Sequence, residues 1–185
     1  DVYKRQTLNG GSGDDNLSGG SGDDIYLVDS VSDTVTENLS EGTDKVISSV
    51  SFTLSSDVEN LSLTGSADIN GSGNALDNIL IGNSGANILN GEVGADNLKG
   101  GGGNDTLNGG SGDDNLSGGS GDDTLNGGDD NDYLFGNGNN DTLNGGGGND
   151  IIFGDLGNDT LSGGSGNDTL NGGSGDDTLN LSLIH

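Results

Sequence analysis

The sequence predicts an all-β fold in which one short strand recurs along most of the chain. From Leu80 to Leu179 a leucine or isoleucine returns at every ninth residue. From Leu98 onward an aspartate stands two residues before each of these apolar positions, and a glycine-rich run precedes each aspartate. Self-similarity at a fixed period is typical of repeat architectures, whose units stack into a solenoid. These observations predict a β-solenoid.

Composition alone would favour a disordered chain. Only 26% of the residues are hydrophobic, and 31 acidic residues against four Lys and Arg give a net charge of −27. Low hydrophobicity with high net charge is typical of disorder. However, the chain has no proline, and a flexible linker has no reason to keep one register through twelve successive apolar positions. We therefore expect an ordered chain that depends on cations.

Each repeat follows the pattern G-G-x-G-x-D-x-U-x, where U is a large apolar residue. The last three residues form a minimal strand, with U inward and its neighbours outward. Glycines at positions 1, 2 and 4 permit tight turns with positive φ. They also leave backbone carbonyls free to converge on a hard cation. Calcium takes about six to eight oxygen ligands, so carbonyls and aspartate carboxylates together suit it.

This pattern resembles the RTX, or haemolysin-type, calcium-binding repeat family, over residues 7–27 and 65–180. The resemblance implies a right-handed parallel β-roll. In it, six residues form a calcium-binding turn, three form a strand, and two repeats complete one coil. Eight stacked aspartate pairs, from Asp96/Asp114 to Asp159/Asp177, would then each share a Ca²⁺ ion. The implied ligands are the position-6 aspartates: Asp15, Asp24, Asp96, Asp105, Asp114, Asp123, Asp132, Asp141, Asp150, Asp159, Asp168 and Asp177.

Several repeats depart from the pattern. Asn78 and Asn87 stand where the carboxylate belongs, so we expect weak or empty sites there. Asp130 and Asn139 replace the third glycine, and both residue types tolerate left-handed backbone better than most. Position 2 carries a larger residue in three repeats: Glu92, Asn137 and Asp155. We expect these changes to affect individual sites and not the roll as a whole.

Residues 28–64 interrupt the nonapeptide between the short block 7–27 and the main block 65–180. Alternating and β-branched stretches in this insert predict further strands, in wider coils that continue the solenoid. We interpret its aspartates as turn residues rather than ligands: Asp29, Asp33, Asp44 and Asp57.

Both ends of the chain fall outside the repeat register. Residues 1–6 (DVYKRQ) and 181–185 (LSLIH) match the translations of a sequencing-library transposon end and of its reverse complement. We expect both segments to be adaptor read-through that flanks an internal fragment, and we exclude them from reasoning about the fold.

The eighteen-residue coil also sorts the outward-facing residues into two surfaces. One carries a ladder of Thr and Asn. The other stacks four large apolar residues, Tyr133 over Ile151 and Phe135 over Phe153. Mutual cross-strand packing accounts for them. The alternative is a docking patch for a neighbouring domain or partner, since clustered apolar groups are unusual on so polar a chain.

The sequence offers no catalytic constellation. It has no cysteine, its one histidine, His185, lies in the suspected adaptor, and no G-x-S-x-G motif occurs. The strong acidity argues against nucleic acid or an anionic membrane surface as a partner. We therefore do not expect this segment to be an enzyme.

The resemblance implies a module of a protein that is exported by type I secretion to an extracellular destination. Extracellular calcium modules bind at about 0.1–1 mM, so such a chain stays unfolded in the low-calcium cytosol and folds outside. Two other roles remain open: the structural roll of a surface adhesin or matrix protein, and the tail of a secreted metalloprotease, lipase or epimerase. The flanking sequence would distinguish them.

Overall fold

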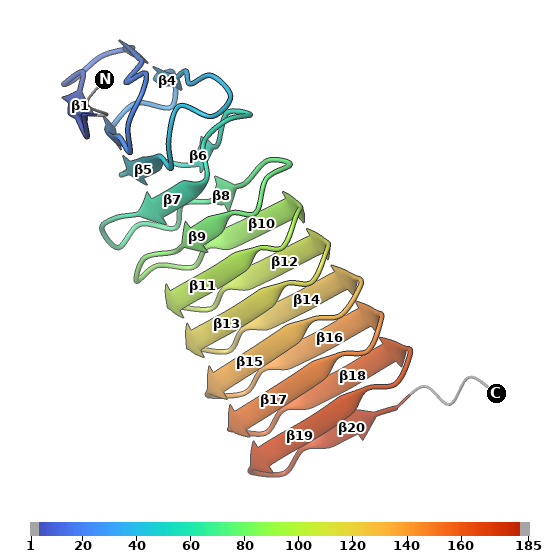
Figure 1. The fold of residues 1–185 in the computed structure, drawn as a ribbon. Coiled ribbons are helices and arrows are strands. Elements are labelled where there is room, and N and C mark those ends of the chain that lie inside the picture. Colours follow the sequence, from blue (N-terminus) through green and yellow to red (C-terminus); the bar gives the residue numbers. More distant parts are fainter. Residues whose placement is uncertain (1–3, 182–185) are drawn as a thin grey trace.

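The computed structural model describes residues 4–181, which form twenty strands and no helix. Every pairing between strands is parallel, and the coils stack into an elongated solenoid with the two ends of the chain at opposite ends (Figure 1). The predicted all-β parallel roll is thus confirmed. Of the suspected adaptor segments, residues 1–3 and 182–185 lie outside the described range. None of the described residues belongs to a helix that could cross a membrane.

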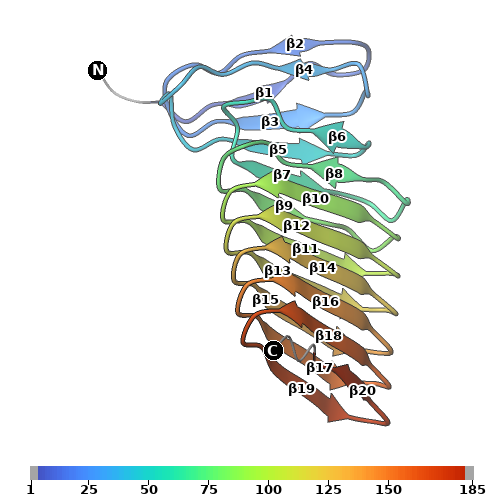
Figure 2. The same ribbon diagram turned by 90° about the vertical axis from the view of Figure 1, so that its right-hand side faces the viewer.

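Two long sheets form opposite sides of the solenoid (Figure 2). The ten-stranded sheet contains β1 (Thr7–Asn9), β3 (Ile25–Val28), β5 (Lys45–Ser48), β7 (Asn60–Leu63), β9 (Ile79–Ile81), β11 (Asn97–Gly102), β13 (Asn115–Ser120), β15 (Tyr133–Gly138), β17 (Ile151–Leu156) and β19 (Thr169–Ser174). The eight-stranded sheet contains β6 (Phe52–Thr53), β8 (Gly71–Ser72), β10 (Ile88–Val93), β12 (Thr106–Ser111), β14 (Thr124–Asp129), β16 (Thr142–Gly147), β18 (Thr160–Ser165) and β20 (Thr178–Asn180). The strands β2 (Asn16–Leu17) and β4 (Thr34–Val35) pair separately.

The core is one row of apolar side chains along each sheet. From β9 onward each paired residue lies opposite the residue eighteen positions later, so that Leu98 lies over Leu116 and Leu107 over Leu125. These leucines are fully buried. Because each strand of the main block contributes at most a single large apolar residue to the interior, the core there is thin, and hydrophobic burial supplies only a small part of what ordering the chain costs.

The strands of the main block are longer than the sequence predicted. Each strand from β10 to β19 spans six residues, as in β12, where the expected x-U-x triplet continues through the following G-G-x. The ladder pairs Gly110 with Gly128 and Ser111 with Asp129 but passes over Gly109. Position 1 therefore interrupts the pairing, and only positions 4 to 6 form the turn.

The three glycines of a repeat have different physical roles. Gly110 and Gly112, at positions 2 and 4, have φ of 122° and 118°, which favours glycine. From Gly91 onward, the residues that replace these glycines also have positive φ, as at Glu92 (83°) and Asp130 (75°). Gly109, at position 1, is not in this region. A Cβ there would lie within 3.0 Å of a carboxylate and a carbonyl oxygen, so position 1 requires glycine for space and not for φ, contrary to the sequence-based expectation.

The insert continues the ten-stranded sheet with coils of unequal length. Ile25 pairs with Lys45, Lys45 with Asn60, and Asn60 with Ile79, which are steps of 20, 15 and 19 residues. Only two of these three coils are wider than the eighteen-residue repeat. The sequence-based expectation of wider coils is therefore wrong for the middle one.

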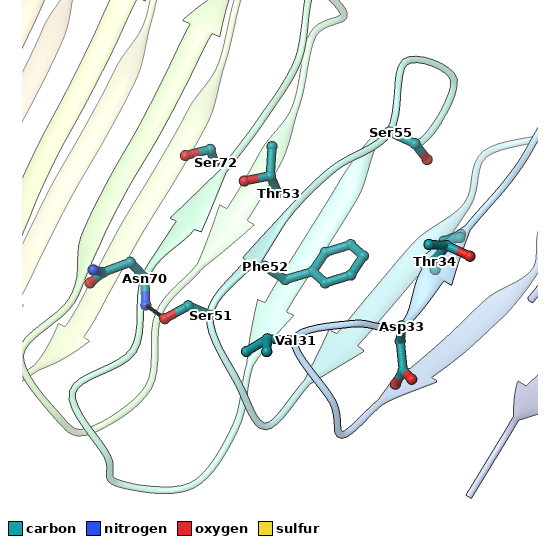
Figure 3. Close-up of a pocket in the computed structure, with 10 residues that line it drawn as sticks. Val31, Asp33, Thr34, Ser51, Phe52, Thr53, Ser55, Asn70 and Ser72 are labelled. Atoms are coloured by element: carbon teal, nitrogen blue, oxygen red, sulfur yellow. Dashed lines mark hydrogen bonds between the residues drawn. The ribbon is translucent and has the colours of Figure 1, made fainter. Parts of the chain in front are cut away.

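On the other side of the insert, the sheet is interrupted between β4 and β6. A groove of about 430 Å³ lies at this break, lined in part by Asp33, Thr34 and Phe52. In Figure 3 the Phe52 ring points toward the side of the groove that carries Asp33 and Thr34, while the Ser51 hydroxyl oxygen accepts a hydrogen bond of 2.9 Å from the Asn70 amide.

The outward apolar residues lie in the register that the coil length predicted. Tyr133 pairs with Ile151, and Phe135 with Phe153. The two phenylalanine rings stack with centroids 5.4 Å apart and an interplanar angle of 4°. Tyr133 is the most open of the four, with 48% of its surface exposed. Mutual packing thus accounts for the phenylalanine pair.

Candidate metal centres

The eight turns from Asp96 to Asp159 place the position-6 aspartate inside the roll. Asp114, for example, is 1% exposed. Its Oδ1 accepts a hydrogen bond of 2.8 Å from the Asp96 amide in the preceding coil, and its own amide donates to Asp132 Oδ1 at 2.9 Å. The same bond links the aspartates on both sides of the roll. The coil-to-coil spacing of eighteen residues thus orients all these carboxylates alike.

The second carboxylate oxygen is left without a donor. In ten of the twelve predicted aspartates, Oδ2 is buried and has no hydrogen-bond partner: Asp15, Asp24, Asp96, Asp105, Asp114, Asp123, Asp132, Asp141, Asp150 and Asp159. The other two, Asp168 and Asp177, lie in the last described coil and are partly exposed. A buried oxygen without a partner is costly, and ten in one register indicate a missing positively charged or donating group.

The surroundings of Oδ2 fit a hard cation. The space that a Cβ of Gly109 would fill is bordered by Asp114 Oδ2 and by the Gly127 carbonyl oxygen of the next coil. Two acceptors thus lie close to the Gly109 backbone, where only glycine leaves room for them. Carboxylate and carbonyl oxygens are the ligands that calcium prefers, so the residues present fit that ion.

Burial also makes these carboxylates resist ionisation when no cation is near. It raises the pKa of four aspartates to about 6, despite the backbone hydrogen bond that each accepts: Asp96, Asp105, Asp114 and Asp123. It raises the pKa of Asp132 and Asp141 to about 7, where the stacked carboxylates of both neighbouring coils add to the effect. The pKa values of Asp150 and Asp159 are raised for the same main reason.

In the two asparagine repeats, hydrogen bonds within the protein satisfy the position-6 side chain without an ion. Asn78 Oδ1 accepts from the Asn74 amide at 2.7 Å, and Asn87 Oδ1 accepts from the Asn83 amide at 2.8 Å. Their side-chain NH₂ groups donate to carbonyls of the preceding coil, at Glu59 for Asn78 and at Ile69 for Asn87. Asparagine thus replaces the unpartnered carboxylate oxygen of the aspartate repeats with an NH₂ group, and this group has hydrogen-bond partners within the protein.

Two aspartates of the insert also belong to this ladder, although the sequence analysis interpreted them as turn residues. Asp33 Oδ1 accepts from the Asp15 amide at 2.9 Å, and Asp44 Oδ1 accepts from the Asp24 amide at 2.7 Å. The available signal was the triplet D-x-U, present as Asp33-Thr-Val without any preceding glycine and as Asp44-Lys-Val with only the position-4 glycine, Gly42. The other two, Asp29 and Asp57, have no such bond to a neighbouring coil.

Comparison with known proteins agrees with this geometry. The sequence profile of the RTX calcium-binding nonapeptide repeat, which spans four copies, matches residues 5–35, 72–107, 108–143, 126–161 and 144–179. No curated protein matches the chain. The profile covers well over half of the chain, including all twelve repeat aspartates. The chain therefore belongs to the family of RTX calcium-binding nonapeptide repeats.

Proposed function

We propose that the repeat aspartates bind calcium in the turns, and that the chain folds when it meets extracellular calcium. The ten buried Oδ2 atoms without partners carry this proposal. Burial opposes the ionisation of the aspartates from Asp96 to Asp159, so a packed roll with charged turns requires a cation between the coils. Magnesium is a poor substitute, because it demands near-octahedral geometry and dehydrates reluctantly.

Family membership supports the cellular context. RTX repeat proteins are typically secreted, which favours an extracellular or cell-surface destination and export by type I secretion. Extracellular calcium modules bind at about 0.1–1 mM, so the affinity itself would keep the chain unfolded before export. Within its parent protein the roll would act as a folding module, as the structural part of an adhesin or matrix protein, or as the tail of a secreted hydrolase or epimerase.

A calcium titration followed by far-ultraviolet circular dichroism tests the proposal. In EDTA the chain should be largely disordered, and it should become β-rich with a midpoint of about 0.1–1 mM calcium. Magnesium at the same concentrations is the control and should leave the spectrum unchanged. A midpoint in the nanomolar range would contradict the proposed switch, because such a chain would already fold in the cytosol.

A further inference from the structure

Three buried carboxylates converge at the junction between the first repeat block and the insert. One oxygen from each of Asp24, Glu37 and Asp44 lies within 4.8 Å of the others. The residues are 1%, 6% and 1% exposed. Asp24 and Asp44 precede β3 and β5 of the ten-stranded sheet, whereas Glu37 follows β4 on the other side of the roll. The cluster thus joins three coil segments.

Backbone amides satisfy only one oxygen of each carboxylate. Asp24 Oδ1 accepts from the Gln6 amide at 2.6 Å, Glu37 Oε1 from the Gly19 amide at 3.0 Å, and Asp44 Oδ1 from the Asp24 amide at 2.7 Å. Asp24 Oδ2 and Glu37 Oε2 are buried without a partner. These two free oxygens come from side chains that are more than nine-tenths buried.

A phenol oxygen borders the same space. The Gly19 amide also donates to the Tyr26 hydroxyl oxygen at 2.7 Å. A Cβ on Gly19 would lie within 3.0 Å of both Asp24 Oδ2 and this hydroxyl oxygen. Glycine at position 19 therefore keeps open a small space that is bordered by a carboxylate and a phenol.

The cluster differs from a repeat site in one ligand. In a regular coil the residue eighteen positions after the first glycine is another glycine, whose carbonyl oxygen lies close to that first glycine, as the Gly127 carbonyl and Asp114 Oδ2 lie close to Gly109. Glu37 is the residue eighteen positions after Gly19 and brings a carboxylate to this place. Within residues 4–181 the one salt bridge joins Arg5 and Asp23, so no Lys or Arg forms a salt bridge with the cluster.

We propose that Glu37 and Asp44 join the repeat aspartate Asp24 in one cation site of its own composition, an inference that rests on calcium binding by the repeat aspartates. The oxygen-only ligand set selects a hard ion, with calcium as the expected occupant. Affinity for calcium rises with the number of charged ligands, so this site fills before the sites of the main block. The bound ion fastens the insert to the first repeat block, where the nonapeptide pattern ends.

Terbium luminescence isolates this site, because the chain has three tyrosines and no tryptophan. In a Tyr3→Phe, Tyr133→Phe background, excitation of tyrosine sensitises only Tb³⁺ bound near Tyr26. Glu37→Gln and Asp44→Asn each keep an oxygen that can accept the hydrogen bond from the backbone amide, but they remove the negative charge. Glu92→Gln is the matched control, since Glu92 is exposed and distant in the sequence.

In the parent, we expect the luminescence midpoint to lie at a lower Tb³⁺ concentration than the folding midpoint of the repeats. Circular dichroism of the same samples measures the folding midpoint. Glu37→Gln and Asp44→Asn should raise the Tb³⁺ midpoint by at least about tenfold, since even ligand-supporting residues commonly cost that much. The control should stay within about twofold of the parent.

Two results would overturn the proposal. One is a midpoint in either variant that matches the parent. The other is a variant that recovers no β spectrum at saturating calcium, because losing one local ion must leave the main block able to fold. The dichroism signal reports the repeats independently, so failure of this site is distinguishable from failure of the repeat sites.

Discussion

At the scale of single residues, the buried aspartates couple the roll to pH. Burial raises the pKa of Asp132 to about 7, whereas an unfolded aspartate titrates near about 3.9. A raised pKa stabilises the cation-free fold fully below about pH 4, and this contribution is lost as the pH rises through about 7. Calcium requires the ionised form, so protons compete with it across the same window.

We therefore predict that the calcium midpoint rises as the pH falls from 8 to 5.5. In EDTA, the same acidification should increase β content, because protonated aspartates no longer repel one another. Circular dichroism titrations at several pH values measure both effects. A calcium midpoint that does not depend on pH in this window would show that the aspartates are ionised without the metal.

Position 1 of the repeat provides a second test at this scale. Gly127→Ala places a methyl group within 3.0 Å of Asp132 Oδ2 and the Gly145 carbonyl oxygen. We expect it to cost about 1–3 kcal/mol in the calcium-loaded roll and to raise the calcium midpoint. Gly138→Ala is the control, because its nearest neighbour would be 3.7 Å away. Equal denaturation midpoints for the two variants would refute the steric role of position 1.

At the scale of strands, the stacked phenylalanines of β15 and β17 should stabilise the outer face. A double-mutant cycle with Phe135→Ser and Phe153→Ser should give a coupling free energy of about 0.5–1.5 kcal/mol in calcium.

Self-association of the calcium-loaded chain, measured by analytical ultracentrifugation, tests the docking alternative. A coupling near zero, together with self-association that the double variant abolishes, would favour docking over mutual packing.

The period of nine predicted one short strand in each repeat and the positions of the repeat aspartates. The resemblance to the RTX family implied the two-repeat coil, and with it the strand order and the register. The sequence did not predict six-residue strands, since G-G-x has low strand propensity and only stacking between coils keeps it extended. It also missed the ladder positions of Asp33 and Asp44, because Asp33 lacks all the glycines that mark the register and Asp44 keeps only Gly42. Glu37 carries no sequence signal, since coil geometry alone brings it to Asp24.

At the scale of the whole molecule, each coil is stabilised mainly by its two neighbours. Asp132→Ala removes a carboxylate between two aspartate-bearing coils, those of Asp114 and Asp150. Asp15→Ala alters the first coil, whose one stacked carboxylate is Asp33. Stability in repeat proteins propagates through nearest neighbours, so the interior change should raise the calcium midpoint more. Equal shifts in the calcium titration would contradict a cooperative roll.

The central claim is that calcium completes this fold, because the net charge of −27 and the thin core do not sustain it alone. Small-angle X-ray scattering of one sample in EDTA and then in millimolar calcium tests this most directly, with magnesium as the control. The claim predicts a radius of gyration near about 46 Å, that of an unfolded chain of this length, in EDTA. It predicts a much smaller, rod-like particle in calcium only. A compact rod in EDTA would contradict it.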